Sequence, residues 1–284
     1  MSPAATTARE IVATTPGVPA SDGAGVRMTR IIGSPQLDML DPFLLLDCFE
    51  SDRPEDYIGG FPDHPHRGFE TVTYLLAGRM RHKDNAGNEG VIEPGGVQWM
   101  TAGRGIVHSE MPEQENGLLM GFQLWVNLPA RAKMTAPGYQ EFGPDQVPLE
   151  RWDDGTTVRV VAGTTAAGTR GAVRNDYVQP TYLDVTLPPG VGFEQAVGAE
   201  DSAFVYAIEG ELKLGQAGKG LPPRTLAVLG PGDRVVAQAG DENARFLLVA
   251  AQPLGEPVAR GGPFVMNTRE EVLQAFDDFR NNRF

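Results

Sequence analysis

The chain is predicted to be an all-β protein built from two antiparallel β-barrels, with one short helix at its C-terminus. Three observations support this prediction. Short apolar segments alternate with turns, and the chain contains 35 glycines and 23 prolines in 284 residues. Two sequence signatures of the first half recur in weaker form in the second half. One amphipathic helical pattern ends the chain.

The composition narrows the classes of function. The net charge is −13 and the pI is near 4.8, so the surface repels phosphate backbones and direct nucleic-acid binding is not expected. Apolar runs are shorter than the roughly 18 residues of a membrane span, so no membrane partner is expected. The first residues lack the pattern of a signal peptide, which favours a cytoplasmic location. The single cysteine, Cys48, lies in an apolar run and is expected in the core.

The first half is predicted to form a metal-binding barrel over residues 26–137, after a flexible tail at residues 1–25 that is rich in Ala, Thr, Pro and Gly. Residues 26–33 alternate between apolar and polar types, which predicts a strand. The apolar run at 41–50 predicts a buried strand, and residues 117–129 form the clearest strand pattern in the chain. That last strand is expected to close the first barrel.

The second half is predicted to form a barrel over residues 138–284, because short strand patterns restart after a Pro- and Gly-rich linker at about 129–150. YAIEGELKL at 206–214 resembles YLLAGRMRH at 74–82. A second pair, IEPGGVQWM and LGPGDRVVA, surrounds a Pro-Gly turn in each half. These pairs indicate two copies of one barrel.

The end of the chain is predicted to form a helix. Thr268 and Glu271 have the spacing of a capping box. One face of the helix is apolar and consists of Val272, Leu273, Ala275, Phe276 and Phe279. We expect this face to pack against a barrel; the alternative is that it binds a partner protein.

All four histidines lie between Gly59 and Glu110. His64 and His66 are two residues apart, and His108 and Glu110 have the same spacing. Side chains two apart in a strand point to the same face, so each pair presents two ligand-type groups in one direction. If the two strands face each other, three imidazoles and one carboxylate converge, which predicts a metal site. The alternative is that each histidine is an ordinary hydrogen-bonded residue.

Two other residues have less specific patterns. His82 lies in the polar segment RMRHKD and is predicted to be exposed at a strand end. Glu70 lies four residues after His66, so continued alternation would place it on the face of the histidines. We expect it to orient a histidine through a hydrogen bond. A fifth ligand, or an ion pair with Arg67 or Arg79, is the alternative.

The second copy lacks these ligand-type residues. The equivalent positions, counted from the shared turns, are Ala196, Gly198 and Arg245, and no histidine follows residue 108. The C-terminal barrel is therefore predicted to be free of metal.

Three long motifs resemble those of the pirin family, a branch of the cupin superfamily. They are HPHRGFETVTYLLAG, GGVQWMTAGRGIVHSEMP and GPFVMNTREEVLQAFDDFRNNRF, and the resemblance runs from about residue 26 to the C-terminus. It implies a bicupin, with two cupin-type barrels and one metal in the N-terminal barrel. It also implies that iron is the usual metal and that the ligands match His64, His66, His108 and Glu110.

The resemblance also implies an activity. Three imidazoles and a carboxylate leave open positions on a six-coordinate metal and suit Fe²⁺, although Mn, Co, Ni, Cu and Zn fit as well. Bacterial pirin-like proteins are associated with quercetin 2,3-dioxygenase activity, which opens the flavonol ring with O₂ and releases carbon monoxide. A flavonol-like substrate is therefore implied, with Glu110 as both a ligand and the catalytic base.

Two other functions fit the same ligands. Some pirin-like proteins are regulators in which the iron state alters docking onto a transcription factor or a metabolic enzyme. A redox-sensing protein with a regulatory partner is therefore the second hypothesis. A metal with only a structural role is the third, and it is disfavoured because apolar strands do not need an ion to fold.

Overall fold

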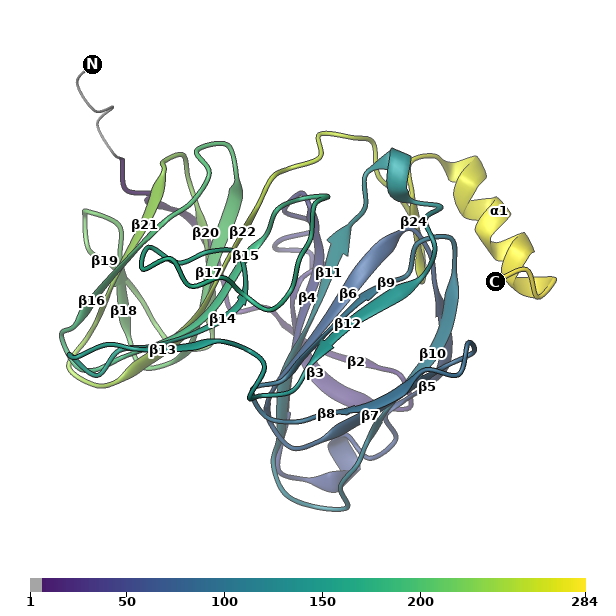
Figure 1. Ribbon diagram of the computed structural model, residues 1–284, viewed down its shortest axis with the longest axis horizontal. Helices are drawn as coiled ribbons and strands as arrows, with labels where there is room; N and C mark the ends of the chain where they lie inside the picture. Colours follow the sequence, from purple (N-terminus) through teal and green to yellow (C-terminus); the bar gives the residue numbers. More distant parts are fainter. Residues whose placement is uncertain (1–6) are drawn as a thin grey trace. The chain divides into compact units, whose positions relative to one another are not determined.

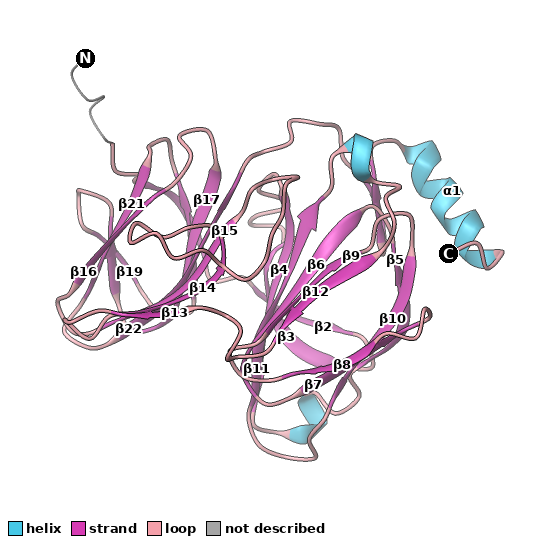
Figure 2. Ribbon diagram, in the orientation of Figure 1, coloured by secondary structure: helices cyan, strands magenta, loops and turns pink. Residues whose placement is uncertain are grey.

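The structure is a computed structural model, and it describes residues 7–284. Within this range the regular secondary structure is almost entirely β-strand, with two short 3₁₀ helices and a single α-helix, α1, at Arg269–Arg280 (Figure 2). The predicted all-β fold with a short C-terminal helix is confirmed. In the described part of the chain, α1 is too short and too polar to span a membrane.

The chain divides into two compact units (Figure 1). The N-terminal unit contains Val18–Gln146 and Leu254–Phe284. The C-terminal unit contains Val147–Pro253 and the described residues up to Gly17. Each unit holds one seven-stranded and one four-stranded antiparallel sheet, in agreement with the prediction of two copies of one cupin-type fold.

The N-terminal unit carries the histidines. Its larger sheet has, in order, β12 (Gly138–Phe142), β9 (Val97–Thr101), β6 (Phe69–Ala77), β11 (Leu119–Asn127), β4 (Phe43–Ser51), β3 (Val26–Ile32) and β2 (Val18–Asp22). Its smaller sheet has β5 (Phe61–His66), β10 (Ile106–Pro112), β7 (Met80–Asp84) and β8 (Glu89–Ile92). A two-stranded sheet of β23 (Ala259–Gly261) and β24 (Phe264–Met266) precedes α1. The 3₁₀ helices are at Pro54–Asp56 and Ala130–Ala132.

The C-terminal unit repeats this arrangement. Its larger sheet has β1 (Ile11–Thr15), β20 (Thr225–Leu229), β17 (Ser202–Glu209), β22 (Ala244–Ala251), β15 (Thr181–Leu187), β14 (Thr157–Ala162) and β13 (Leu149–Arg151). Its smaller sheet has β16 (Gly192–Ala196), β21 (Arg234–Ala239), β18 (Leu212–Leu214) and β19 (Lys219–Leu221). One apolar core, with members from both sheets, fills the space between them.

The predicted domain boundaries require correction. Strand β12 lies beyond the boundary at 137 but pairs with β9 of the N-terminal unit, and residues 254–284 also belong to that unit. Within the predicted flexible tail, β1 pairs with β20 and β2 pairs with β3, whereas residues 1–6 lie outside the described range. β1 and β12 pair with strands that are distant in the sequence, so local composition does not indicate these pairings, whereas β2 and β3 are consecutive strands.

The C-terminal helix begins as predicted. The Thr268 hydroxyl accepts from the backbone N–H of Glu271 at 3.2 Å, and the Glu271 carboxylate accepts from the backbone N–H of Thr268 at 3.0 Å. Val272 and Ala275 are buried, and α1 packs on β24. The helix therefore packs against its own unit, although Leu273 and Phe279 of the predicted face are exposed.

Candidate metal centre

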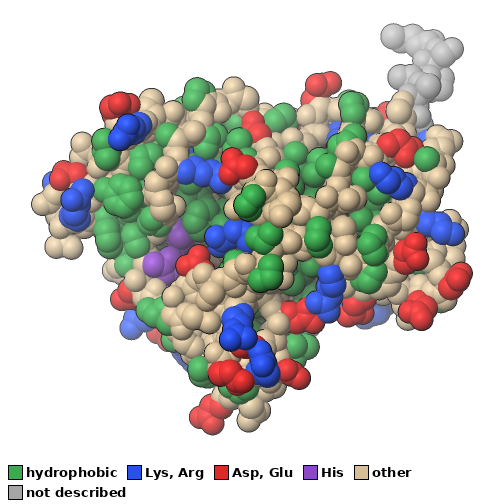
Figure 3. All heavy atoms as spheres, turned by 180° about the vertical axis from the view of Figure 1, so that it is seen from behind, with side chains coloured by type: hydrophobic (Ala, Val, Ile, Leu, Met, Phe, Trp, Pro, Cys, Tyr) green, Lys and Arg blue, Asp and Glu red, His purple; other side chains and the backbone are tan. Residues whose placement is uncertain are grey.

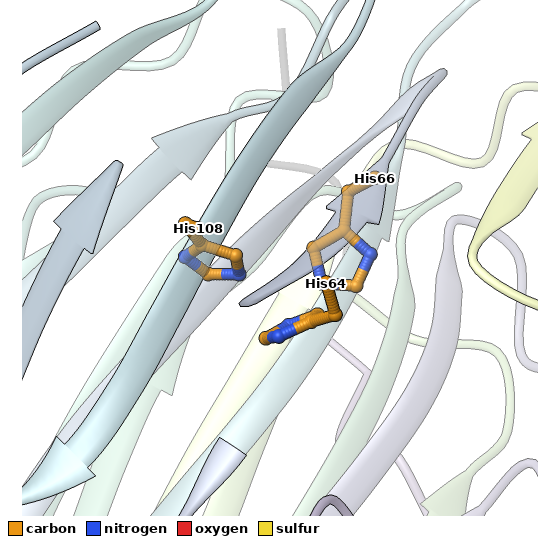
Figure 4. A group of neighbouring side chains, drawn as sticks. All are labelled: His64, His66 and His108. Atoms are coloured by element: carbon orange, nitrogen blue, oxygen red, sulfur yellow. The ribbon is translucent and has the colours of Figure 1, made fainter. Parts of the chain in front are cut away.

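Strands β5 and β10 bring the three predicted histidine ligands together (Figure 4). The two strands are antiparallel neighbours, and His64 lies directly opposite His108. The ring centroids of His64 lie 4.4 Å from His108 and 4.7 Å from His66, and those of His66 and His108 are 5.1 Å apart. One ring nitrogen from each histidine lies within 4.8 Å of the others. The geometry is that of a potential three-histidine metal site.

The sequence around His64 suits an edge strand. Pro62 and Pro65 cannot donate backbone hydrogen bonds, and β5 is the outermost strand of its sheet, where one edge needs no partner. The alternation of β10 places His108 and Glu110 on the buried face.

Burial keeps two of the imidazoles neutral. Burial lowers the pKa of His108 to about 3, with a further contribution from His64, and burial also holds the pKa of His66 well below its ordinary value. Both ring nitrogens of His108 and Nδ1 of His66 are buried without a hydrogen-bond partner among the described residues. Neutral imidazoles are the form that binds metals, and a bound cation would satisfy these lone pairs. The residues present therefore fit a metal ion.

Glu110 is buried beside the histidines but has a different partner. The Thr73 hydroxyl lies 2.8 Å from Glu110 Oε1 and 2.6 Å from Gln123 Oε1. A hydroxyl donates only one hydrogen, so donation to Glu110 requires the Gln123 amide nitrogen to face Thr73. The carboxylate lies outside the group of ligand atoms within 4.8 Å of one another, which consists of the three histidines.

A cavity of about 470 Å³ opens onto this site. Its polar residues include His64, His66, Glu110, Thr73 and Gln123. Its apolar wall includes Met28, Leu45, Phe49, Phe61, Met80 and Trp125. The space-filling view shows histidine side chains at the surface with hydrophobic and acidic side chains around them (Figure 3). This combination of an apolar wall and a few convergent polar groups is typical of a small-molecule site.

The prediction for His82 is wrong. Its side chain is 3% exposed and points inward from β7, with Nε2 2.5 Å from the carboxylate of Glu141. In the sequence, Arg81, Lys83 and Asp84 make this strand appear fully solvated. Only one of its faces is solvated, because Met80, His82 and Asp84 are all buried.

Glu70 does not extend the site. Phe69 packs on His66 with ring centroids 5.0 Å apart, and Thr73 contacts Glu110, so the odd-numbered residues of β6 face the histidines. Alternation places Glu70 on the opposite face, where it accepts from Thr101 at 2.7 Å. The turn at Gly68 separates β5 from β6 and breaks the alternation between His66 and Glu70.

Several residues of the site were not found from the sequence. Thr73 and Gln123 lie on strands far from the histidine motifs, and Arg260 and Pro263 reach the cavity wall from the end of the chain. An alternating strand pattern shows which residues share a face. It does not show which strands enclose a common cavity, so no local signal identified these four residues.

Comparison with known proteins gives the family. The models for Pirin and for the Pirin C-terminal cupin domain match residues 25–126 and 182–284. A pirin-like protein of Caulobacter vibrioides is 56% identical over 276 residues, covering 97% of this chain and 99% of the relative. Human Pirin is 48% identical over 267 residues, covering 92% of this chain and 89% of the relative. The crystal structure of a quercetin 2,3-dioxygenase from Acinetobacter baumannii superposes with a TM-score of 0.89 and 33% identity, covering 98% of each chain. The chain belongs to the pirin family.

Proposed function

We propose that this protein is an iron-dependent dioxygenase that cleaves a flavonol such as quercetin with O₂. In this proposal His64, His66, His108 and Glu110 hold Fe²⁺. The observation that carries the proposal is the cluster of three imidazoles, two of them kept neutral by burial, beside a cavity of about 470 Å³ with an apolar wall. The similarity to the Acinetobacter baumannii enzyme supports the choice of reaction.

The cavity suits a planar aromatic substrate. Its volume lies within the range of roughly 300–1,000 Å³ that is usual for small-molecule sites. Phe61 and Trp125 of the wall offer aromatic surface to the rings of the substrate, and His64, His66 and Glu110 offer polar groups to its oxygens. A flavonol would therefore enter with its adjacent hydroxyl and carbonyl oxygens toward the histidines.

The ligand set suits iron. Imidazole and carboxylate ligands also accept Mn, Co, Ni, Cu and Zn, so iron remains the proposed metal on the basis of family resemblance. Bound iron would supply the redox chemistry with O₂, and the protein would bind and orient the substrate.

Glu110 is the proposed proton acceptor. Its carboxylate lines the cavity, where it would receive the proton of the flavonol hydroxyl as the substrate binds. The hydrogen bond from Thr73 holds one carboxylate oxygen in place. A Glu110→Gln protein that kept both full iron content and full turnover would contradict the role of Glu110.

The direct test is aerobic incubation of the Fe²⁺-reconstituted protein with quercetin. Flavonol loss, oxygen uptake and carbon monoxide release are followed together, beside a His64→Ala control. We expect stoichiometric oxygen uptake and carbon monoxide release that the control lacks.

Tight iron binding without turnover would contradict the enzymatic proposal. It would favour the redox-sensing alternative, in which the iron state changes binding to a regulatory protein. Partner capture with oxidised and with reduced iron would then be the next measurement. The cytoplasmic location stays a prediction.

A further inference from the structure

The fourth histidine lies beside the proposed ligands. Strand β7 pairs with β10, and the register places His82 opposite Glu110 and Asp84 opposite His108. Residues directly opposite each other in an antiparallel pair project from the same face, with their Cβ atoms roughly 5 Å apart. His82 and Asp84 therefore lie next to the two residues of β10 that the proposed function assigns to the metal.

The side chain of His82 contacts residues of the opposite, larger sheet. Its Nε2 lies 2.5 Å from Glu141 Oε2, and that carboxylate oxygen also accepts from Gln98 Nε2 at 2.8 Å. The imidazole ring also packs on Tyr139, with centroids 5.4 Å apart. Glu141 and Tyr139 belong to β12, and Gln98 belongs to β9, so the imidazole bridges the two sheets of the unit. These contacts restrict the rotation of the ring.

The neighbouring strand β8 leaves room for the contact between His82 and Glu141. Gly90 of β8 lies opposite His82. A Cβ at this position would lie 2.5 Å from His82 Nε2 and even closer to the Glu141 carboxylate. A larger residue at position 90 would therefore push the pair apart.

A purely structural role explains Asp84 better than it explains His82. The Asp84 carboxylate accepts from the backbone N–H groups of Ala86 and Asn88 and from the Asn88 side chain, so it stabilises the turn between β7 and β8. His82 and Glu141 stabilise no turn. An apolar pair would join the sheets equally well, because a contact to the partly exposed Glu141 side chain adds little net stability.

We propose that His82 and Glu141 are positioning residues that hold the Glu110 carboxylate in the orientation required to bind the metal. This inference rests on the ligand set of the proposed function. A fixed imidazole beside Glu110 reduces the number of rotamers open to the carboxylate, so less conformational entropy is lost when it binds a cation. Residues that support metal ligands in this way typically change metal affinity by about 10–100-fold.

The test is titration of the metal-free protein with Co²⁺, followed by its visible absorption, which reports both affinity and coordination geometry. We expect His82→Phe, Glu141→Ala and Gly90→Ala to weaken Co²⁺ binding about tenfold and to change the spectrum in the direction that Glu110→Gln changes it. His82→Gln retains an N–H donor for Glu141 and should restore most of the affinity. A merely structural role would not change the spectrum.

Two control variants keep the site intact. Glu89→Ala removes an exposed carboxylate of β8 that pairs with Arg81, and Gly138→Ala adds a methyl group to β12 in open space. Both should bind Co²⁺ as the wild type does. Thermal unfolding of each metal-free variant checks folding. If His82→Phe does not fold, Gly90→Ala still tests the contact, because it displaces the His82–Glu141 pair without replacing either residue.

The outcomes separate this inference from the proposed function. If Glu110→Gln weakens binding but the His82, Glu141 and Gly90 variants match the wild type in affinity and spectrum, the positioning role is wrong. If the wild type does not bind Co²⁺, or if Glu110→Gln matches it, the proposed ligand set is wrong and the positioning role is wrong with it.

Discussion

The guanidinium of Arg67 lies 2.6 Å from the carboxylate of Asp278, although 211 positions separate the two residues in the chain. Arg67 directly follows His66, and only 3% of its side chain is exposed. Its Nε donates to the carbonyl of Arg104 at 2.5 Å, and its guanidinium lies 4.3 Å from the centroid of the Phe284 ring. One buried cation therefore joins the turn after β5, the loop before β10 and the C-terminal helix.

Removing the carboxylate of Asp278 should destabilise the N-terminal unit. Asp278→Ala leaves the Arg67 cation buried without a counter-charge, which costs about 3–5 kcal/mol for a fully buried pair. Because 16% of the Asp278 side chain is exposed, we expect a loss of about 2 kcal/mol in the free energy of unfolding. Urea denaturation followed by circular dichroism measures this loss.

The neighbouring residue provides the control. Asp277 lies on the same helix and pairs with Arg283, but 56% of its side chain is exposed. Asp277→Ala should change the free energy of unfolding by no more than about 0.5 kcal/mol. Equal losses in the two variants would show that the Arg67 contact contributes no special stability.

Replacing His64 should abolish specific metal binding. Changes to residues that only support a metal ligand cost about 10–100-fold in affinity, so His64→Ala should cost at least about a hundredfold. The measurement is metal content after reconstitution with Fe²⁺ and gel filtration. Asp63→Ala, at the exposed neighbouring position, should retain the wild-type content. Wild-type metal content in the His64→Ala protein would exclude this residue as a ligand.

Replacing Thr73 should affect turnover more than metal content. Thr73→Val keeps the shape of the side chain but removes the hydroxyl that contacts Glu110. Hydrogen bonds to charged groups contribute about 1.5–3 kcal/mol, so we expect kcat for flavonol loss to fall at least roughly tenfold. Thr71→Val, two residues away on β6, leaves the Glu110 contact in place and serves as the control. A Thr73→Val protein with unchanged kcat would show that this hydroxyl does not assist Glu110.

The metal-free protein should lose stability as the pH falls from about 6.5 toward about 3. Burial lowers the pKa of His108 to about 3 in the folded protein, whereas the unfolded chain takes up this proton near pH 6.5. The unfolded state therefore binds more protons throughout this window, and each pH unit costs about 1.4 kcal/mol for this one group. The low pKa of His66 acts in the same direction.

Urea midpoints at pH 7 and pH 5 measure the effect. Protonation of the carboxylates changes the stability of the wild type and of His108→Gln equally between pH 7 and pH 5. The difference between the two proteins in their loss of stability therefore reports the imidazole of His108 alone. His108→Gln should show the smaller loss of stability. Equal losses of stability in the two proteins would contradict a neutral, buried His108.

The local sequence was sufficient to predict those features that depend on contacts between neighbouring residues. The capping box of Thr268 and Glu271 depends on contacts within one helical turn, and the structure contains it. The convergence of His64, His66 and His108 follows from strand alternation once the two strands are neighbours. Backbone geometry sets this alternation, so a short motif carries the information.

Whether a strand face is buried or exposed to solvent depended on how the sheets pack. The polar neighbours of His82 made its strand look solvated, but the larger sheet covers one face of β7 and buries the histidine against Glu141. Glu70 lies beyond the turn at Gly68, where the alternation counted from His66 no longer applies. The burial of these two residues follows from contacts with distant strands.

Only the tertiary structure showed which distant segments complete the N-terminal unit. Strand β12 adds to β9, and residues 254–284 return to the unit, where Asp278 reaches Arg67 and Pro263 reaches the cavity. Such contacts gain free energy only after the whole unit has closed around them. A local pattern therefore predicts the strands and the histidine motif, whereas the fold as a whole decides which residues enclose the site.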